Sequence, residues 1–314
     1  MCVRPRAQER PFRVPADRKG PFRNPARALA LLAVVLLAAG CVRRATPADL
    51  LVRAGPLTLQ YSCTARESRT WDLEQVLRGR VTLGGMPEVL SLKIRGRMTE
   101  TARIVMPDGR CQLKLEYDFE PISVNGMPVE MKGVQRRSET FAMRSPAGDL
   151  EMLEMEKPDT DILTWASRNL GGMGPLLPPA PVSSGEKWDR LQKLALGKDG
   201  QLDIATLGVL RGVEERDGHR CAILAMEGGA NLAAPMPDSG LEFLRLEYTG
   251  LVYFALDEGA VHESRQEGTL AVKARTKGGT MEGRFAFTSV LKRVAVSATV
   301  PAEPGVAPAG PSSP

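Results

Sequence analysis

The chain of 314 residues has few of the side chains on which most enzyme active sites depend. It contains two histidines, and aromatic residues make up only 5% of it. Neither histidine has the setting of a general base, because His219 falls in the turn sequence DGHRC and His262 reads as a solvent-exposed strand residue. No Gly-x-Ser-x-Gly sequence marks a nucleophilic serine. We therefore expect no catalytic residues and a protein that is not an enzyme.

The sequence also lacks the ligand spacings of metal sites. Cys-x-x-Cys, His-x-His and His-Glu-x-x-His are all absent. Four methionines precede prolines, and thioethers can bind Cu(I), but these residues are dispersed along the chain: Met86, Met106, Met127 and Met236. Phosphate-binding loops are missing too. We predict no metal site and no cofactor.

No apolar run is long enough to cross the hydrocarbon layer of a membrane as a helix. The longest, Ala28 to Gly40, would make about 20 Å of helix, whereas the hydrocarbon layer is about 30 Å thick. Eight Arg and Lys residues precede it, which is typical of a secretory signal. The stretch from Leu37 to Cys41 resembles the lipobox of bacterial lipoproteins, although the preferred Leu stands one position early. The resemblance implies a signal over residues 1–40 and a lipid on Cys41; an ordinary cleaved signal and a retained anchor are the alternatives.

The positive charge of the chain belongs mostly to this leader. Residues 1–40 hold 8 of the 42 Lys and Arg but only 2 of the 37 Asp and Glu, which leaves 34 basic and 35 acidic side chains. A near-neutral mature chain lacks the basic surface of a nucleic-acid-binding protein. We therefore exclude nucleic acid as a partner.

Three cysteines remain after Cys2 and Cys41 are set aside. Cys63, Cys111 and Cys221 would lie in a compartment that permits disulfides. Because three is an odd number, at most one pair can form within the chain. Three buried free thiols, a Cys63–Cys111 bridge and a Cys111–Cys221 bridge all fit the sequence.

Alternation of apolar and polar residues dominates the rest of the chain and predicts a mainly β protein. It is clearest from Leu90 to Met98 and from Cys111 to Phe119, and is weaker from Leu270 to Ala274 and from Met281 to Phe287. Such alternation is typical of antiparallel sheets with one face in water. Gly-Gly, Asp-Gly and Asn-Gly pairs supply the hairpin turns, at residues 84–85, 108–109, 125–126, 217–218 and 278–279.

One short helix and a proline-rich stretch divide the β segments into two halves. The helix is expected from the apolar face of Ile162, Leu163, Ala166 and Leu170, with Gly171 at its end. We predict two curved antiparallel sheets that could be a tandem repeat, since Asp108 to Leu113 resembles Asp217 to Ile223. The predicted organisation is a signal peptide (1–40), a tether (41–55), a first β-rich half (56–157), a helix and linker (158–187), a second β-rich half (188–298) and a disordered tail (299–314).

The lipobox, the two β-rich halves and the linker residues Pro181, Val182, Gly185 and Trp188 resemble a family of uncharacterised bacterial lipoproteins of unknown function. The fold is loosely similar to that of periplasmic carriers of lipids and lipoproteins. This resemblance implies an envelope lipoprotein anchored through its N-terminal lipid, and Val42 after the cysteine favours the outer membrane, facing the periplasm. We expect a non-catalytic scaffold or interaction protein with an envelope protein as partner. A carrier of a hydrophobic ligand and an unrecognised envelope enzyme are the alternatives.

Overall fold

The computed structural model describes residues 54–129, 137–154, 174–196, 200–235, 240–276 and 279–297. All of them lie in one compact unit, residues 50–314. The predicted signal, the lipid site at Cys41, the expected helix near Ile162 and the tail lie outside the described residues. No helix in the described ranges has the length and apolar character needed to cross a membrane.

The described residues confirm the mainly β class. Their strands are β1 (Ser68–Leu83), β2 (Met86–Val105), β3 (Cys111–Phe119), β4 (Ile122–Val124), β5 (Met127–Val129), β6 (Arg137–Arg144), β7 (Leu150–Glu154), β8 (Lys187–Leu196), β9 (Gly200–Arg216), β10 (His219–Leu232), β11 (Leu241–Ala255), β12 (Ala260–Thr276) and β13 (Gly279–Ser297). All paired neighbours run antiparallel.

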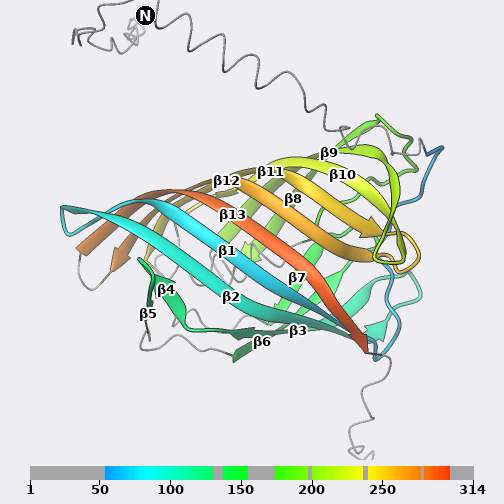
Figure 1. The fold of residues 1–314 in the computed structure, drawn as a ribbon, viewed down its shortest axis with the longest axis horizontal. Coiled ribbons are helices and arrows are strands. Elements are labelled where there is room, and N and C mark those ends of the chain that lie inside the picture. Colours follow the sequence, from blue (N-terminus) through cyan, green and yellow to red (C-terminus); the bar gives the residue numbers. More distant parts are fainter. Residues whose placement is uncertain are drawn as a thin grey trace, which may run out of the picture. The chain divides into compact units, whose positions relative to one another are not determined.

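These strands form one sheet, so the expectation of two separate sheets was wrong. The strand order is β7-β6-β3-β2-β1-β13-β12-β11-β10-β9-β8, with the β4–β5 hairpin attached to β2. The first and last strands join the halves, because β1 pairs with β13 from Ser68 opposite Ser297 to Leu83 opposite Met281. Figure 1 shows β12, β13, β1 and β2 running obliquely side by side. Sequence alternation could not reveal this pairing because both strands have the pattern of any half-buried strand.

The hairpin turns lie where the glycine pairs predict them. Gly84, Gly85, Gly109 and Gly126 all have positive φ angles, and so do Asp217 and Gly218 between β9 and β10. These backbone angles are the ones that two-residue hairpin turns require. Leu150–Glu154 forms β7 at one end of the sheet order.

One face of the sheet holds the core. Along β3 the side chains of Cys111, Leu113 and Leu115 are buried, while those between them are less so. The inward face of β13 includes Phe285 and Leu291, both buried. Alternate residues point to opposite faces of a strand, so the curved sheet surrounds a mainly apolar interior and turns most of its charged side chains outward. Glu100, Arg144 and Arg293 are exceptions, since they are buried.

Glycines beneath large side chains shape the interior. Trp188 of β8 lies opposite Gly208 of β9, where a Cβ would lie 2.2 Å from Trp188 Cε2. Tyr248 of β11 lies between Gly228 and Gly268 on the neighbouring strands. A Cβ on Gly268 would lie 1.9 Å from the Glu247 carbonyl oxygen. Glycine is therefore required at these positions by close approach of ring or backbone.

The segments 54–63 and 174–186 cover one end of the interior. Leu57 and Val182 pair as an isolated bridge, and the Tyr61 ring packs edge-on against Phe254 at 5.3 Å between centroids. Two indoles anchor this end: Trp71 Nε1 donates to the Val261 carbonyl at 2.9 Å, and Trp188 Nε1 donates to the Leu176 carbonyl at 2.9 Å. Both tryptophans are buried core residues.

Candidate functional site

An uncharged cavity lies inside the curved sheet and measures about 70 Å³. Its apolar lining comes from seven strands and one connecting segment: Leu77, Leu150, Leu176, Ile204, Ala230, Leu246, Leu270 and Phe287. Its polar lining consists of amides and hydroxyls: Gln75, Gln192, Thr206, Tyr248, Gln266 and Ser289. No Asp, Glu, Lys, Arg or His lines it among the described residues. A mostly apolar cavity with a few polar groups is the usual form of a site for a small ligand.

Three of the polar side chains share one row across the sheet. Gln266 of β12 lies opposite Ser289 of β13, which in turn lies opposite Gln75 of β1. Gln75 Nε2 donates to Ser289 Oγ at 3.4 Å, beyond the usual range for a good hydrogen bond. We call Gln75, Ser289 and Gln266 the amide row.

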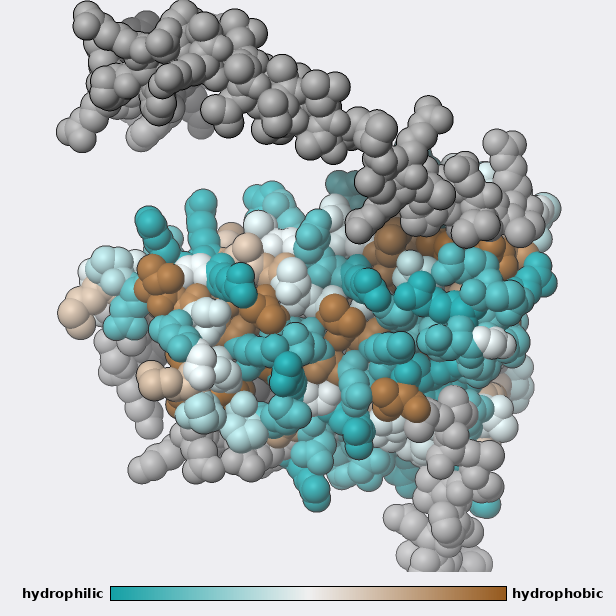
Figure 2. Space-filling view, viewed as in Figure 1, coloured by the Kyte–Doolittle hydropathy of each residue, from teal (hydrophilic) through white to brown (hydrophobic). Residues whose placement is uncertain are grey.

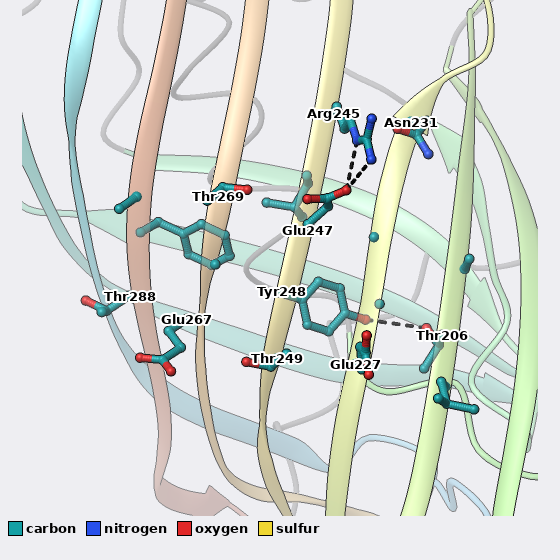
Figure 3. Close-up of a pocket in the computed structure, with 18 of the residues that line it drawn as sticks. Thr206, Glu227, Asn231, Arg245, Glu247, Tyr248, Thr249, Glu267, Thr269 and Thr288 are labelled. Carbon is teal, nitrogen blue, oxygen red and sulfur yellow. Dashed lines mark hydrogen bonds and ion pairs between the residues drawn. The ribbon is translucent and has the colours of Figure 1, made fainter. Parts of the chain in front are cut away.

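Tyr248 forms part of the cavity wall next to this row. Its hydroxyl and Thr206 Oγ1 lie 3.4 Å apart, and Figure 3 shows the ring reaching across β10 toward Thr206. Burial raises the pKa of the phenol, and the bond to Thr206 opposes this only in part. Gly228 makes room for the ring, since a Cβ there would lie 2.8 Å from the Tyr248 hydroxyl. Tyr248 therefore stays neutral at physiological pH.

The two ends of the sheet order meet beside the cavity. Arg190 of β8 donates through Nη2 to Asp149 Oδ1 at 2.6 Å and through Nη1 to the Leu177 carbonyl at 2.9 Å. Gln192 Nε2 donates to the carbonyl of Leu150 in β7 at 2.5 Å. Among the described residues no backbone hydrogen bond joins β7 to β8. We call this side-chain contact between the two edge strands the seam.

A wide trough lies on the outward face of the same strands and has a volume of about 1270 Å³. Glu227, Thr249 and Glu267 follow one another across it on β10, β11 and β12, as Figure 3 shows. Neither glutamate forms an ion pair with another described residue, whereas Glu247 is bonded to Arg245. The face seen in Figure 2 is largely hydrophilic, with separate apolar side chains among the polar ones.

A charged cluster lies at the covered end of the sheet. His219 Nδ1 lies 3.2 Å from Asp257 Oδ2 and 3.3 Å from Glu258 Oε1, an arrangement that could hold a metal ion. Arg293, only 4% exposed in its side chain, is paired with Glu258, and its Nη2 lies 3.2 Å from His219 Nε2. This guanidinium charge opposes a cation at the same place.

His262 belongs to the same cluster, and the expectation of an exposed histidine was wrong. Its residue is 4% exposed, Nε2 lies 3.1 Å from Asp217 Oδ2, and Nδ1 lies 3.5 Å from Arg293 Nη2. The turn between β9 and β10 brings Asp217 over the start of β12. That contact joins residues 45 apart, so strand alternation alone could not indicate it.

The three cysteines lie at the covered end. Cys63 and Cys111 form a disulfide, one of the two pairings that the sequence left open. Cys221 is free and fully buried. Burial and the charge of Asp257 raise the pKa of its thiol to about 12, so it is almost wholly protonated at neutral pH. Cys41 lies outside the described residues, and its lipidation stays a prediction.

Comparison with known proteins gives only remote likenesses. No family model and no curated protein sequence matches the chain. A lipovitellin structure, described by its lipid–protein interactions, matches with a TM-score of 0.42 and 12% identity over 77% of this chain and 26% of that one. The chain thus spans about a quarter of that protein. A DUF1329 family protein from Desulfovibrio piger has a TM-score of 0.15 and 11% identity over 74% of this chain and 85% of its own.

A third solved structure is an outer membrane lipoprotein-sorting protein domain from Vibrio parahaemolyticus. It matches with a TM-score of 0.11 and 10% identity over 74% of this chain and 85% of its own. Likenesses this weak do not indicate a function.

Proposed function

We propose that this protein is a non-catalytic carrier of the bacterial cell envelope that takes the apolar part of a ligand, such as an acyl chain, into the interior of its sheet. One observation carries the proposal: the cavity inside the curved sheet is lined by apolar and neutral polar side chains and by no charged one among the described residues. The lipid on Cys41 would hold the carrier at a membrane, with the outer membrane as the favoured location.

The lining of the cavity favours a carrier over an enzyme. An active site usually brings together titratable groups whose pKa values are shifted toward their catalytic roles. Tyr248 is the one titratable side chain of the described lining, and its raised pKa keeps it neutral. Such a wall can bind hydrocarbon but supplies no acid, base or nucleophile suited to neutral pH.

The size of the cavity implies that the sheet opens to load a ligand. About 70 Å³ holds a few water molecules or a short length of hydrocarbon, well below the roughly 300 Å³ or more of typical ligand sites. The seam is the expected point of opening, because side chains rather than a backbone ladder join its two strands. Separating β7 from β8 would enlarge the cavity without breaking strand pairing elsewhere.

Native mass spectrometry of the full chain extracted in detergent tests the proposal. We expect copurifying lipid on the wild type and its loss in Leu246→Trp, where a larger side chain fills the cavity. Leu251→Trp is the matched control, since Leu251 lies on the same strand, faces outward and is 39% exposed. An empty wild-type protein that also takes up no added acyl lipid would contradict the carrier.

A scaffold or interaction role is the second candidate, and the outward trough favours it. Its volume of about 1270 Å³ and its unpaired Glu227 and Glu267 would suit a basic protein surface. Glu227→Gln with Glu267→Gln should then weaken capture of an envelope protein without changing the lipid content. Unchanged capture by the double variant would reject the trough as the contact surface.

A further inference from the structure

We infer that the interior selects ligands with a neutral hydrogen-bonding group within or at the end of the apolar chain, such as an ester or an amide, over free fatty acids and plain hydrocarbons. This inference rests on the proposed function, because it names the class of ligand that the cavity would take. It depends on the amide row rather than on the apolar wall.

The amide row holds polar atoms that the described residues leave poorly satisfied. Gln75 and Ser289 are each 7% exposed, and the bond between them is 3.4 Å long. A glutamine amide offers two donors and a carbonyl acceptor, so most of the bonding capacity of Gln75 is unused among the described residues. Gln266, half-buried beside them, makes no side-chain hydrogen bond to a described residue.

Buried polar groups are nearly always hydrogen-bonded, because an unpaired one costs about 1–3 kcal/mol. A ligand that brings its own acceptor or donor to the row would remove that cost. A plain hydrocarbon would instead displace water from these amides and leave them unpaired. The row therefore favours a ligand with a polar group over one without.

The same surroundings disfavour a charged group. No Lys, Arg or His lines the cavity among the described residues, so a carboxylate there would be desolvated without a counter-ion. Arg190, two residues before the lining residue Gln192 on β8, is already bonded to Asp149 and to the Leu177 carbonyl. The neutral amides of Gln75 and Gln266 can donate hydrogen bonds to an ester carbonyl and can both donate to and accept from an amide. Esters and amides are therefore the chemical class that fits.

The apolar side chains around the amide row determine where the polar group must lie along the ligand. Leu77 lies opposite Phe287, and each is two residues along its strand from Gln75 or Ser289. Leu270 lies four residues beyond Gln266 on β12. A hydrocarbon segment would contact these residues while the polar group lies against Gln75 and Gln266. The ligand thus has its neutral group beside an apolar stretch, as in an acyl ester.

Three probes of equal chain length test the inference by competition against a fluorescent naphthylamine probe on the full chain: methyl palmitate, palmitate at pH 8 and hexadecane. The wild type should bind methyl palmitate at least about tenfold more tightly than either of the others, as expected for one well-made hydrogen bond to a buried amide. Gln75→Leu with Gln266→Leu should abolish that preference and leave hexadecane binding equal or tighter.

Gln112→Leu is the matched control, because Gln112 alternates with the inward residues of β3 and faces away from the cavity. Gln266→Leu alone, at a half-buried position, serves if the double variant fails to fold, and should lower the preference severalfold. Equal binding of the three probes, or tightest binding of palmitate, would overturn the inference and leave the carrier intact. Failure of the wild type to bind any of them would overturn the carrier itself.

Discussion

Arg190 and Asp149 form an ion pair of 2.6 Å between the two ends of the sheet order. Asp149 immediately precedes β7, and Arg190 lies on β8, the opposite edge strand. The same guanidinium also bonds the Leu177 carbonyl, so one side chain fastens both an edge strand and the segment that covers the interior. At this place the two edge strands are joined by individual side-chain contacts, which can break one at a time.

Arg190→Leu should speed the exchange of bound probe several-fold while lowering the free energy of unfolding by about 1 kcal/mol or less, because Asp149 is partly exposed. Stopped-flow release of the fluorescent probe measures the exchange. Arg137→Leu is the control, since its partner Asp118 lies away from the seam and both side chains are well exposed. Equal release from the wild type and both variants would rule out the seam as the route.

The buried ion pair of Arg144 and Glu100 should matter for stability rather than for binding. Nη1 and Oε2 lie 2.6 Å apart, with side chains only 7% and 5% exposed, and the guanidinium also covers the Tyr61 ring. Glu100→Leu should cost about 3–5 kcal/mol because it strands a buried charge. Glu100→Leu combined with Arg144→Leu should recover most of that loss in urea unfolding. Additive losses would show that the two charges are not coupled.

Acid should destabilise the fold through Glu263. Burial alone would raise the pKa of this carboxyl, but hydrogen bonds from Arg265 and Arg216 outweigh burial and hold the pKa below its usual 4.5. A lowered pKa in the folded state gives stability that is present above about pH 4.5 and is lost as the pH falls through the folded value. Thermal unfolding from pH 3 to pH 6 should show a steeper fall for the wild type than for Glu263→Gln. If the stability of both proteins falls equally with pH, groups other than Glu263 cause the loss of stability in acid.

The proposed lipid anchor on Cys41 makes a prediction independent of the fold. Cys41→Ser should move the protein from the membrane fraction to the soluble fraction and remove acyl chains from its N-terminus. Fractionation followed by mass spectrometry of the N-terminal peptide measures both. Replacement of Cys221, which is buried and distant in sequence, should leave the membrane attachment unchanged. Retention of Cys41→Ser in the membrane would contradict the lipobox assignment.

The sequence predicted the strands and turns well because these depend on local patterns. Alternation from Cys111 to Phe119 corresponds to β3, and the Asp217–Gly218 pair corresponds to the turn between β9 and β10. A local pattern cannot tell which strands pair at a distance. The contact of β1 with β13, and with it the single sheet, therefore required the structure.

The cavity was harder to predict than the fold. Inward leucines and phenylalanines look the same in a solid core and in the wall of a cavity, and the sequence left both possibilities open. The signal that could have helped is polar: Gln75, Gln266 and Ser289 occupy inward positions next to apolar residues such as Leu77, Leu270 and Phe287. Glycines such as Gly208 and Gly228 show where a ring crosses the neighbouring strand only once the cross-strand partners are known.

The pairing of β1 with β13 also bears on how the chain folds. Ser68 meets Ser297, so the middle of the sheet cannot form until nearly the whole polypeptide is present. Contacts between residues so far apart in sequence slow folding and leave strand edges open to aggregation meanwhile. A chain delivered through a membrane from its N-terminus would keep β1 without its partner until the end of translocation. Such a chain would benefit from a chaperone that protects β1 until β13 arrives.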